Sequence, residues 1–309
     1  MTRRPSRILL FWLACAAGAT SGTTLELRPA PERCGVAAPP QPAIPAAAAS
    51  RIPDSRAVSG SRNITWVWLG SPTSRYAHDA LGSSVHAARL HAIVLQTDGS
   101  QRMLSLELPP NRVFEDRAPR LADLDGDGRD EIILVESDVN LGASLVVYGL
   151  RLGAGSRQPV LAQLARSPFI GIPQRWLNPV GVADFDGGGR LDLAAVTTPH
   201  IGGVLTLYRY QPPLLEPRTQ LPAFSNHRIG TADQQLSAIV TLPGQRPAVI
   251  VPAGNLLTLR VVRIDGAGRW RDLAAPVALT AQVKRIDALP SGACVLMTDG
   301  KTVQAALRE

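Results

Sequence analysis

The chain has 309 residues and a formal net charge of +7, and 45% of its residues are hydrophobic, which is ample for one large β domain or two smaller ones. Its 27 glycines and 26 prolines favour many turns over long helices. Aromatic residues make up only 5%, and the basic residues are scattered beyond the N-terminal segment. The composition therefore argues against a nucleic-acid-binding protein.

The N-terminus has the pattern of a signal peptide. Three arginines (Arg3, Arg4 and Arg7) precede the apolar run Ile8–Ala17, and small residues precede Thr20. The apolar run is too short to cross a membrane, which takes about 20 residues, and no later stretch is long enough. We expect residues 1–19 to be a cleaved signal, a periplasmic or secreted location, and no transmembrane span.

The three cysteines divide between the signal and the exported chain. Cys15 could belong to a lipoprotein signal, but Trp12 stands where an aliphatic residue is expected, so we interpret Cys15 as removed with the signal. Cys34 and Cys294 remain, and in an oxidising compartment they can form a disulfide that joins the N-terminal tail to the last structural unit. Two isolated thiols are the alternative.

Residues 20–62 are rich in proline and alanine, and they predict a disordered spacer. From residue 63 to residue 309 the pattern changes to short β-rich runs separated by turns, which is typical of a sandwich, barrel or propeller. Only Val85–Ala92 has a pattern that could form a helical turn or two. We therefore expect an all-β domain over residues 63–309.

An internal repeat favours one of these architectures. The segment Leu121–Glu131 has a counterpart at Val182–Asp192, 61 residues later, and each is followed by an apolar strand, a turn and a strand that ends in tyrosine. Two fainter copies, at Leu242–Val251 and Ala288–Met297, keep the turn and the strand without the acids. A repeated unit of four short strands is a propeller blade.

The first copy contains an acidic loop with the spacing of calcium ligands. Calcium prefers six to eight oxygen ligands, mostly carboxylates and carbonyls. The loop has acids at positions 1, 3, 5 and 9, a glycine at position 6 that permits the turn, and a carbonyl at position 7. The predicted calcium ligands are Asp123, Asp125, Asp127, the carbonyl of Arg129, and Glu131.

An EF-hand has the same opening, but it needs a glutamate at position 12, and here that position is Leu134 within an apolar strand. The sequence therefore predicts a calcium loop in a β-hairpin.

The second copy is a weaker candidate for a metal. Asp184, Asp186 and Asp192 occupy positions 1, 3 and 9, and the carbonyl of Arg190 occupies position 7, but Gly188 replaces the acid at position 5. One missing carboxylate lowers the affinity for calcium. A weak second metal site and a purely structural turn remain open as alternatives.

These residues resemble the FG-GAP/VCBS repeat family, whose propeller blades have loops of the form Asp-x-Asp-x-Asp-Gly-x-x-Asp. The resemblance covers Pro119–Leu150 and Val180–Tyr210, and it extends over the rest of residues 63–309 only by periodicity. Glu131 replaces the usual last aspartate, and Gly188 is a larger departure. The resemblance implies a β-propeller, calcium in the hairpin loops, and export, but no reaction.

The length of the repeat gives about four blades over residues 63–309, and counting residues 76–118 as a further, irregular blade predicts five, with four, six or seven as alternatives. The last copy, Val283–Arg308, is short by one strand, and we expect the N-terminal strand Ile64–Leu69 to complete it and close the ring. This arrangement would also bring the N-terminal tail close to Cys294.

The sequence contains no catalytic motif. Its five histidines show no metal-ligand spacing, and it lacks nucleophile-elbow, phosphate-loop and Cys-x-x-Cys patterns. We therefore expect a non-catalytic, monomeric, calcium-stabilised binding module that recognises a protein or another component of the cell envelope. The alternatives are a hydrolase or lyase with its active site in the central channel, and a purely structural envelope protein.

Overall fold

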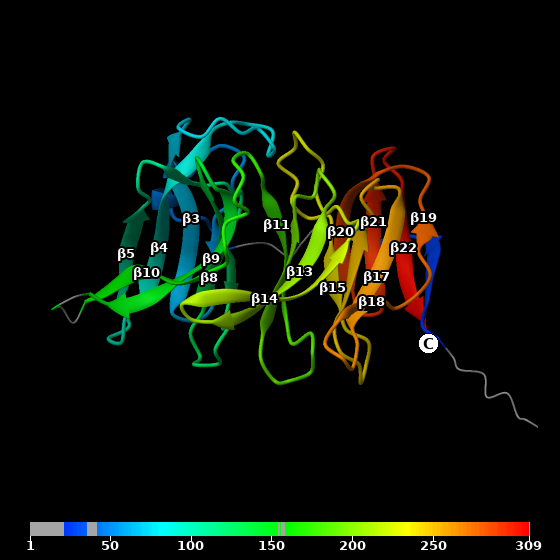
Figure 1. The fold of residues 1–309 in the computed structure, drawn as a ribbon. Coiled ribbons are helices and arrows are strands. Elements are labelled where there is room, and N and C mark those ends of the chain that lie inside the picture. Colours follow the sequence, from blue (N-terminus) through cyan, green and yellow to red (C-terminus); the bar gives the residue numbers. More distant parts are fainter. Residues whose placement is uncertain (1–21, 36–41, 154, 156–157, 309) are drawn as a thin grey trace, which may run out of the picture.

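The computed structural model describes residues 22–35, 42–153, 155 and 158–308, and this part of the chain is almost entirely β-structure (Figure 1). The strands form three hydrogen-bonded sheets of four, thirteen and five strands, and none of them closes on itself. Within these sheets, strands that follow one another in sequence pair antiparallel and form successive units. The all-β expectation is confirmed.

Three units make up the largest sheet. The first contains β2 (Val58–Ser59), β3 (Ile64–Thr73), β4 (His86–Leu95) and β5 (Gln101–Glu107). The second contains β7 (Arg120–Ala122), β8 (Glu131–Asp138), β9 (Gly142–Leu152) and β10 (Pro159–Arg166), and β6 (Arg112–Phe114) joins it to the first by pairing with both β4 and β8. The third contains β11 (Leu177–Ala183), β12 (Asp192–Thr197), β13 (Val204–Gln211) and β14 (Leu214–Pro222).

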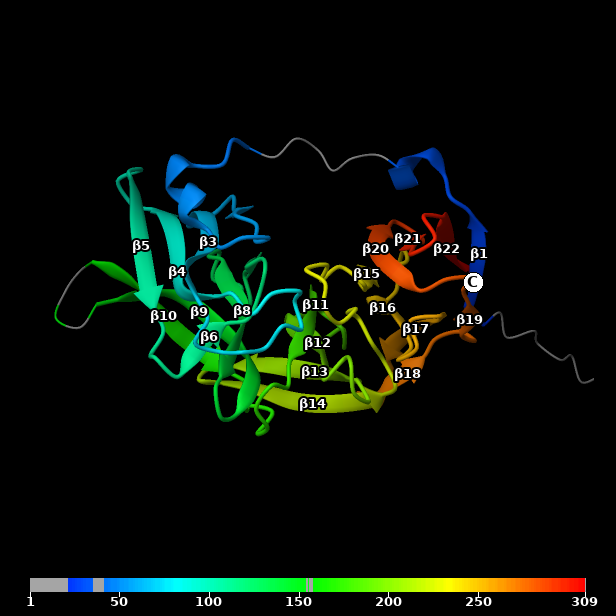
Figure 2. The same ribbon diagram turned by 90° about the horizontal axis from the view of Figure 1, so that it is seen from above.

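The two remaining sheets are a fourth and a fifth unit. The fourth contains β15 (Ala238–Val240), β16 (Ala248–Pro252), β17 (Thr258–Ile264), β18 (Trp270–Asp272) and β19 (Val277–Ala278). The fifth contains β20 (Val283–Leu289), β21 (Gly292–Met297), β22 (Thr302–Arg308) and, from the other end of the chain, β1 (Thr24–Pro29). Seen from above, the units follow one another around an arc (Figure 2).

The strand that completes the fifth unit is β1, and the expectation that Ile64–Leu69 would do so is wrong. β1 pairs along its whole length with β22, and Leu25 lies opposite Leu307. Ile64–Leu69 instead lies in β3, between β2 and β4 of the first unit. The physical reason is burial: Val67, Trp68 and Leu69 are consecutive and all fully buried, which suits the interior of a sheet better than an edge.

The prediction of a disordered spacer over residues 20–62 is also wrong where that stretch forms regular structure. It contains β1, the short 3₁₀ helices η1 (Glu32–Gly35) and η2 (Ala46–Ser50), and β2. η2 buries Ala48 against Trp68 of β3, whereas its other alanines are exposed. The helical turn considered for Val85–Ala92 is wrong as well, because His86–Ala92 belong to β4, which pairs with β3 and β5.

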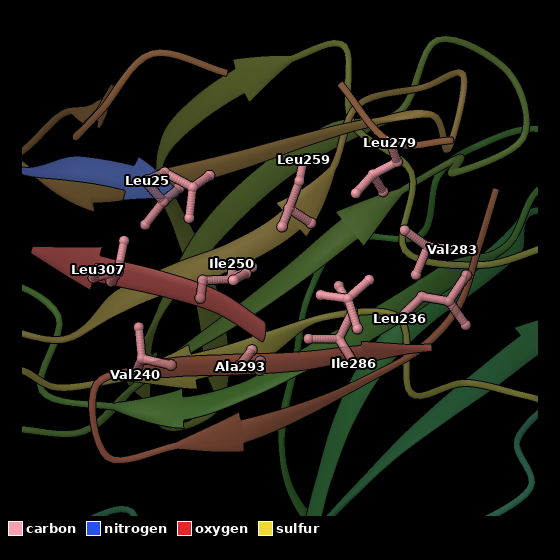
Figure 3. Packing of buried hydrophobic residues seen from close by; sticks show 14 of the residues in the cluster. Leu25, Leu236, Val240, Ile250, Leu259, Leu279, Val283, Ile286, Ala293 and Leu307 are labelled. Carbon is pink, nitrogen blue, oxygen red and sulfur yellow. The ribbon is translucent and has the colours of Figure 1, made fainter. Parts of the chain in front are cut away.

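The hydrophobic core consists of clusters between neighbouring units. The cluster in Figure 3 joins the fourth and fifth units through residues such as Ile250, Leu259, Ile286 and Leu307. Leu25 of β1 belongs to the same cluster and is only 7% exposed. Because the apolar faces of successive sheets cover each other, each unit depends on its neighbour for burial of its side chains.

Candidate functional site

The acidic loop lies between β7 and β8 of the second unit. Ala122, the last residue of β7, pairs with Glu131, the first residue of β8, so the loop spans residues 123–130 at the mouth of a hairpin. Gly126 and Gly128 have positive φ angles of 78° and 85°, a backbone conformation that side chains with a Cβ rarely adopt. The glycine expected at position 6 therefore has the conformational role that its position predicted.

Three of the four predicted carboxylates meet in space. One carboxylate oxygen from each of Asp123, Asp125 and Glu131 lies within 4.8 Å of the other two. Asp123 is partly buried, Asp125 is exposed and Glu131 is buried, so the group opens toward solvent on one side. Three convergent carboxylates on a rigid hairpin match the hard oxygen ligands that calcium prefers.

Backbone N–H groups hold these carboxylates in place. Gly126 and Gly128 donate to the two oxygens of Asp123, at 2.8 and 3.0 Å, and Leu124 donates to Glu131 Oε2 at 2.8 Å. The side chain of Asp127 accepts a hydrogen bond from the backbone N–H of Arg129 at 2.8 Å, and it does not belong to the convergent group. Asp127 thus differs from the other predicted carboxylates only in position, because it lies outside the group that they form.

The charges of the loop are only partly balanced by protein groups. Arg62, from the first unit, contacts Asp123 Oδ2 at 2.8 Å and Asp130 Oδ1 at 3.4 Å. Burial, together with the neighbouring carboxylates of the loop and against the opposing effect of the Leu124 N–H, raises the pKa of Glu131 to about 7. The site therefore has an excess of negative charge that a bound cation could neutralise.

The second acidic loop lies between β11 and β12 and has a different interior. Asp192, the first residue of β12, is fully buried, and it receives two hydrogen bonds from Arg209, at 2.7 and 2.8 Å. The same guanidinium contacts Asp186 Oδ2 at 2.5 Å. Asp184 accepts the backbone N–H of Gly189 at 2.9 Å. Among the described residues, no three acidic side chains of this loop converge as they do in the first loop.

Two of the histidines that seemed isolated in the sequence form a buried pair. His200 Nε2 and His227 Nδ1 are 2.8 Å apart, and Trp176 packs on both rings. The carbonyl of Thr231 can only accept, so His227 must donate from Nε2, and in its neutral form it accepts from His200 at Nδ1. No sequence signal could have found this pair, because 27 residues and different loops separate its members.

A second polar cluster surrounds Glu115, which is fully buried. His78 Nδ1 lies 2.6 Å from one carboxylate oxygen, and Ser137 donates to the other. His86 is also fully buried, donates through Nε2 to the carbonyl of His78 at 2.9 Å, and has no partner at Nδ1 among the described residues. Ser137 lies near the end of β8 opposite to Glu131, so this titratable cluster is separate from the acidic loop.

A cavity with a volume of about 890 Å³ lies between the first strands of neighbouring units. Residues of β2, β7 and β11 line it, together with the segment that leads into β15. Its polar side chains include Arg56, Arg62, Arg120 and Gln234. A smaller cavity of about 210 Å³ lies beside the acidic loop and is lined by Asp125, Glu131 and Tyr210, among others.

The structure joins Cys34 to Cys294 by a disulfide, with their Cα atoms 5.5 Å apart. Cys34 lies in η1, just after β1, and Cys294 lies in β21 of the fifth unit. The bond therefore holds the N-terminal segment on the last unit. The predicted signal peptide, with Cys15, falls outside the described residues. Within the described residues, no helix is long and apolar enough to span a membrane.

Comparison with protein-family models finds no match, and no curated protein matches either. Among solved structures, the chain is similar to that of a Bacteroides fragilis protein named as a candidate 6-phosphogluconolactonase, with a TM-score of 0.42 and 13% sequence identity. The match covers 79% of this chain and 62% of the other, so this chain spans less than two thirds of that protein's length. A likeness of this size carries no argument about activity.

Proposed function

We propose that this protein is an exported, calcium-stabilised β-propeller of the FG-GAP/VCBS type that acts as a non-catalytic binding module of the cell envelope. The observation that carries the proposal is the convergence of Asp123, Asp125 and Glu131 on one point of the β7–β8 hairpin. The stabilising ion in this proposal is calcium, because the ligands are hard oxygens in a tight loop with two glycines of positive φ.

Five blades fit the pairing pattern best. Each of the five units runs through successive antiparallel strands, and β1 supplies the strand that the last unit lacks, so the two ends of the chain meet in one sheet. A propeller can close its ring when a strand from one end of the chain completes the unit at the other end. The cavity between the first strands of the units then corresponds to the central channel.

Thermal unfolding in EGTA and in millimolar calcium tests the metal site. If calcium is present at about 100 times its dissociation constant, binding stabilises the native state by about 2.7 kcal/mol. At an unfolding entropy of about 2.1 cal/mol/K per residue, a change of that size raises the melting temperature of this 309-residue chain by about 4 °C. Asp125→Ala should abolish the rise, whereas Asp98→Ala, which removes an exposed aspartate from the β4–β5 turn, should retain it.

A melting temperature of the wild-type protein that is the same in EGTA and in calcium would contradict the metal proposal. The binding role has its own test: envelope components are captured on the immobilised protein in calcium and then challenged with EGTA. If EGTA elutes the same envelope components from the wild type as from Asp125→Ala, the argument for a calcium-dependent binding surface is removed.

A hydrolase or lyase is the alternative, and the cluster around Glu115 is the observation that favours it. His78 is paired with a fully buried carboxylate, an arrangement that orients an imidazole for proton transfer. Turnover of an ester, lactone or glycoside substrate that is lost in His78→Gln and retained in Asp125→Ala would support an enzyme. Equal rates in the wild type and in His78→Gln would exclude this cluster as the catalytic group.

A further inference from the structure

The two acidic loops occupy equivalent places in their units. Each connects the first strand of a unit to the second, and the second strand then pairs with the third in the same register. Ile132 lies opposite Tyr148 in the second unit, and Leu193 lies opposite Tyr208 in the third. The residue after each tyrosine therefore faces the start of the second strand, which is Glu131 in one unit and Asp192 in the other.

That facing position differs between the units. It is Gly149 in the second unit and Arg209 in the third. A Cβ added at Gly149 would lie 3.8 Å from Glu131 Cγ and 2.5 Å from Leu164 Cδ1, so the position borders the acidic group. Glycine supplies no side chain, so no cation faces Glu131 from this position.

Arg209 fills the corresponding space in the third unit. Its Nε and Nη2 donate to the two oxygens of Asp192 at 2.7 and 2.8 Å, and Nη2 also contacts Asp186 at 2.5 Å. Asp186 and Asp192 stand at loop positions 3 and 9, which in the first loop are Asp125 and Glu131, two members of its convergent group. A planar guanidinium with several N–H donors is well suited to bridge two carboxylates.

Another arginine holds the loop from outside. Arg246 Nη1, from the turn between β15 and β16, donates to the backbone carbonyl of Asp186 at 3.3 Å and to that of Asp265 at 3.5 Å. Asp184 Oδ1 is buried without a partner among the described residues, but one oxygen cannot supply the six to eight ligands of a calcium ion. Gly188 offers no side-chain ligand.

We infer that the guanidinium of Arg209 is the permanent cation of the second acidic loop, occupying the place that a metal ion takes in the first. The protein thus binds one calcium ion per chain, and its third unit is stabilised independently of metal. The role of Arg209 concerns the second loop alone. The stoichiometry of one calcium ion per chain rests on the proposed function of the first loop.

Isothermal titration calorimetry tests the inference. Calcium chloride is titrated into the purified, chelator-treated protein. The wild type should bind one ion per chain, and Asp125→Ala should bind none. The double variant Gly188→Asp/Arg209→Gly copies the first loop, because it supplies the carboxylate at position 5 and removes the guanidinium. Gly188 lies outside the positive-φ region, so its backbone admits aspartate, and a Cβ there would lie 2.9 Å from Asp186 Oδ1, so the Asp186 side chain must shift. This variant should bind two ions, which is a twofold rise in stoichiometry.

The outcomes separate the two proposals. Two ions in the wild type, or one ion in Asp125→Ala that disappears in Asp125→Ala/Asp186→Asn, would overturn the role of Arg209. No ion in the wild type but one in Gly188→Asp/Arg209→Gly would refute the first-loop site and support Arg209. A folded double variant that binds no more calcium than the wild type would overturn the inference. If circular dichroism shows that the double variant does not fold, the number of calcium ions bound by Asp125→Ala decides whether the second loop binds a metal.

Discussion

Replacing Leu25 by alanine tests whether the N-terminal strand completes the fold or whether this segment is only a spacer. Leu25 is 7% exposed, lies opposite Leu307 in the β1–β22 ladder, and belongs to the cluster between the fourth and fifth units (Figure 3). If residues 20–62 were a spacer, the substitution would remove no contact.

The magnitude follows from burial. Truncation of a buried leucine to alanine typically costs about 2–5 kcal/mol, since it removes apolar contact and leaves a cavity. Leu25 lies in an edge strand, where the surroundings can relax, so we expect the lower end of that range, about 2–3 kcal/mol. An unfolding entropy of about 2.1 cal/mol/K per residue gives a shift of about 1.5 °C per kcal/mol for a chain of 309 residues, so the expected fall in melting temperature is about 3–5 °C.

Thermal and urea unfolding followed by circular dichroism measure the change. Glu26→Ala is the matched control, because Glu26 is the next residue of β1, and its exposed side chain has ion pairs only with Arg28 and Arg308. It should leave the midpoint nearly unchanged. If Leu25→Ala unfolds at the same temperature and urea concentration as Glu26→Ala, the reasoning about strand β1 is refuted.

Two further predictions concern the disulfide and pH. Replacing both Cys34 and Cys294 by alanine should destabilise the protein by about 2–4 kcal/mol, because the bridge closes a loop across a sequence separation of 260 residues and restricts the unfolded chain. A reductant should lower the wild-type midpoint and leave that of the double variant unchanged, and equal effects on both would contradict the prediction. Burial, followed by nearby positive charge, lowers the pKa of His200 to about 4 and that of His227 to about 3. Below pH 6.5 the unfolded chain therefore takes up protons that the folded chain excludes, and at pH 5 each histidine should cost about 2 kcal/mol of stability relative to pH 7. His200→Gln should lose less stability than the wild type over that interval in urea titrations, and parallel losses would show that the pair is not responsible.

Local patterns in the sequence were sufficient for the features that depend on neighbouring residues. The spacing of acids and glycines over residues 123–131 predicted a tight hairpin loop with inward-facing carboxylates, because alternate residues of such a turn share one side and glycine permits positive φ. The short apolar runs between turns predicted strands for the same reason. Even so, Asp127 departs from the pattern, because its carboxylate lies outside the group that Asp123, Asp125 and Glu131 form.

The tertiary structure alone decided the contacts between residues that are far apart in the chain. The alternation of residues 24–29 is that of a strand, but only its pairing with β22 shows which unit it completes. Likewise, the sequence shows two similar acidic loops, whereas the arginine that enters the second comes from another strand. Short-range propensity reports how a segment can fold. Register between strands and the side chains that face each other across a sheet depend on the burial of whole units, which no local window contains.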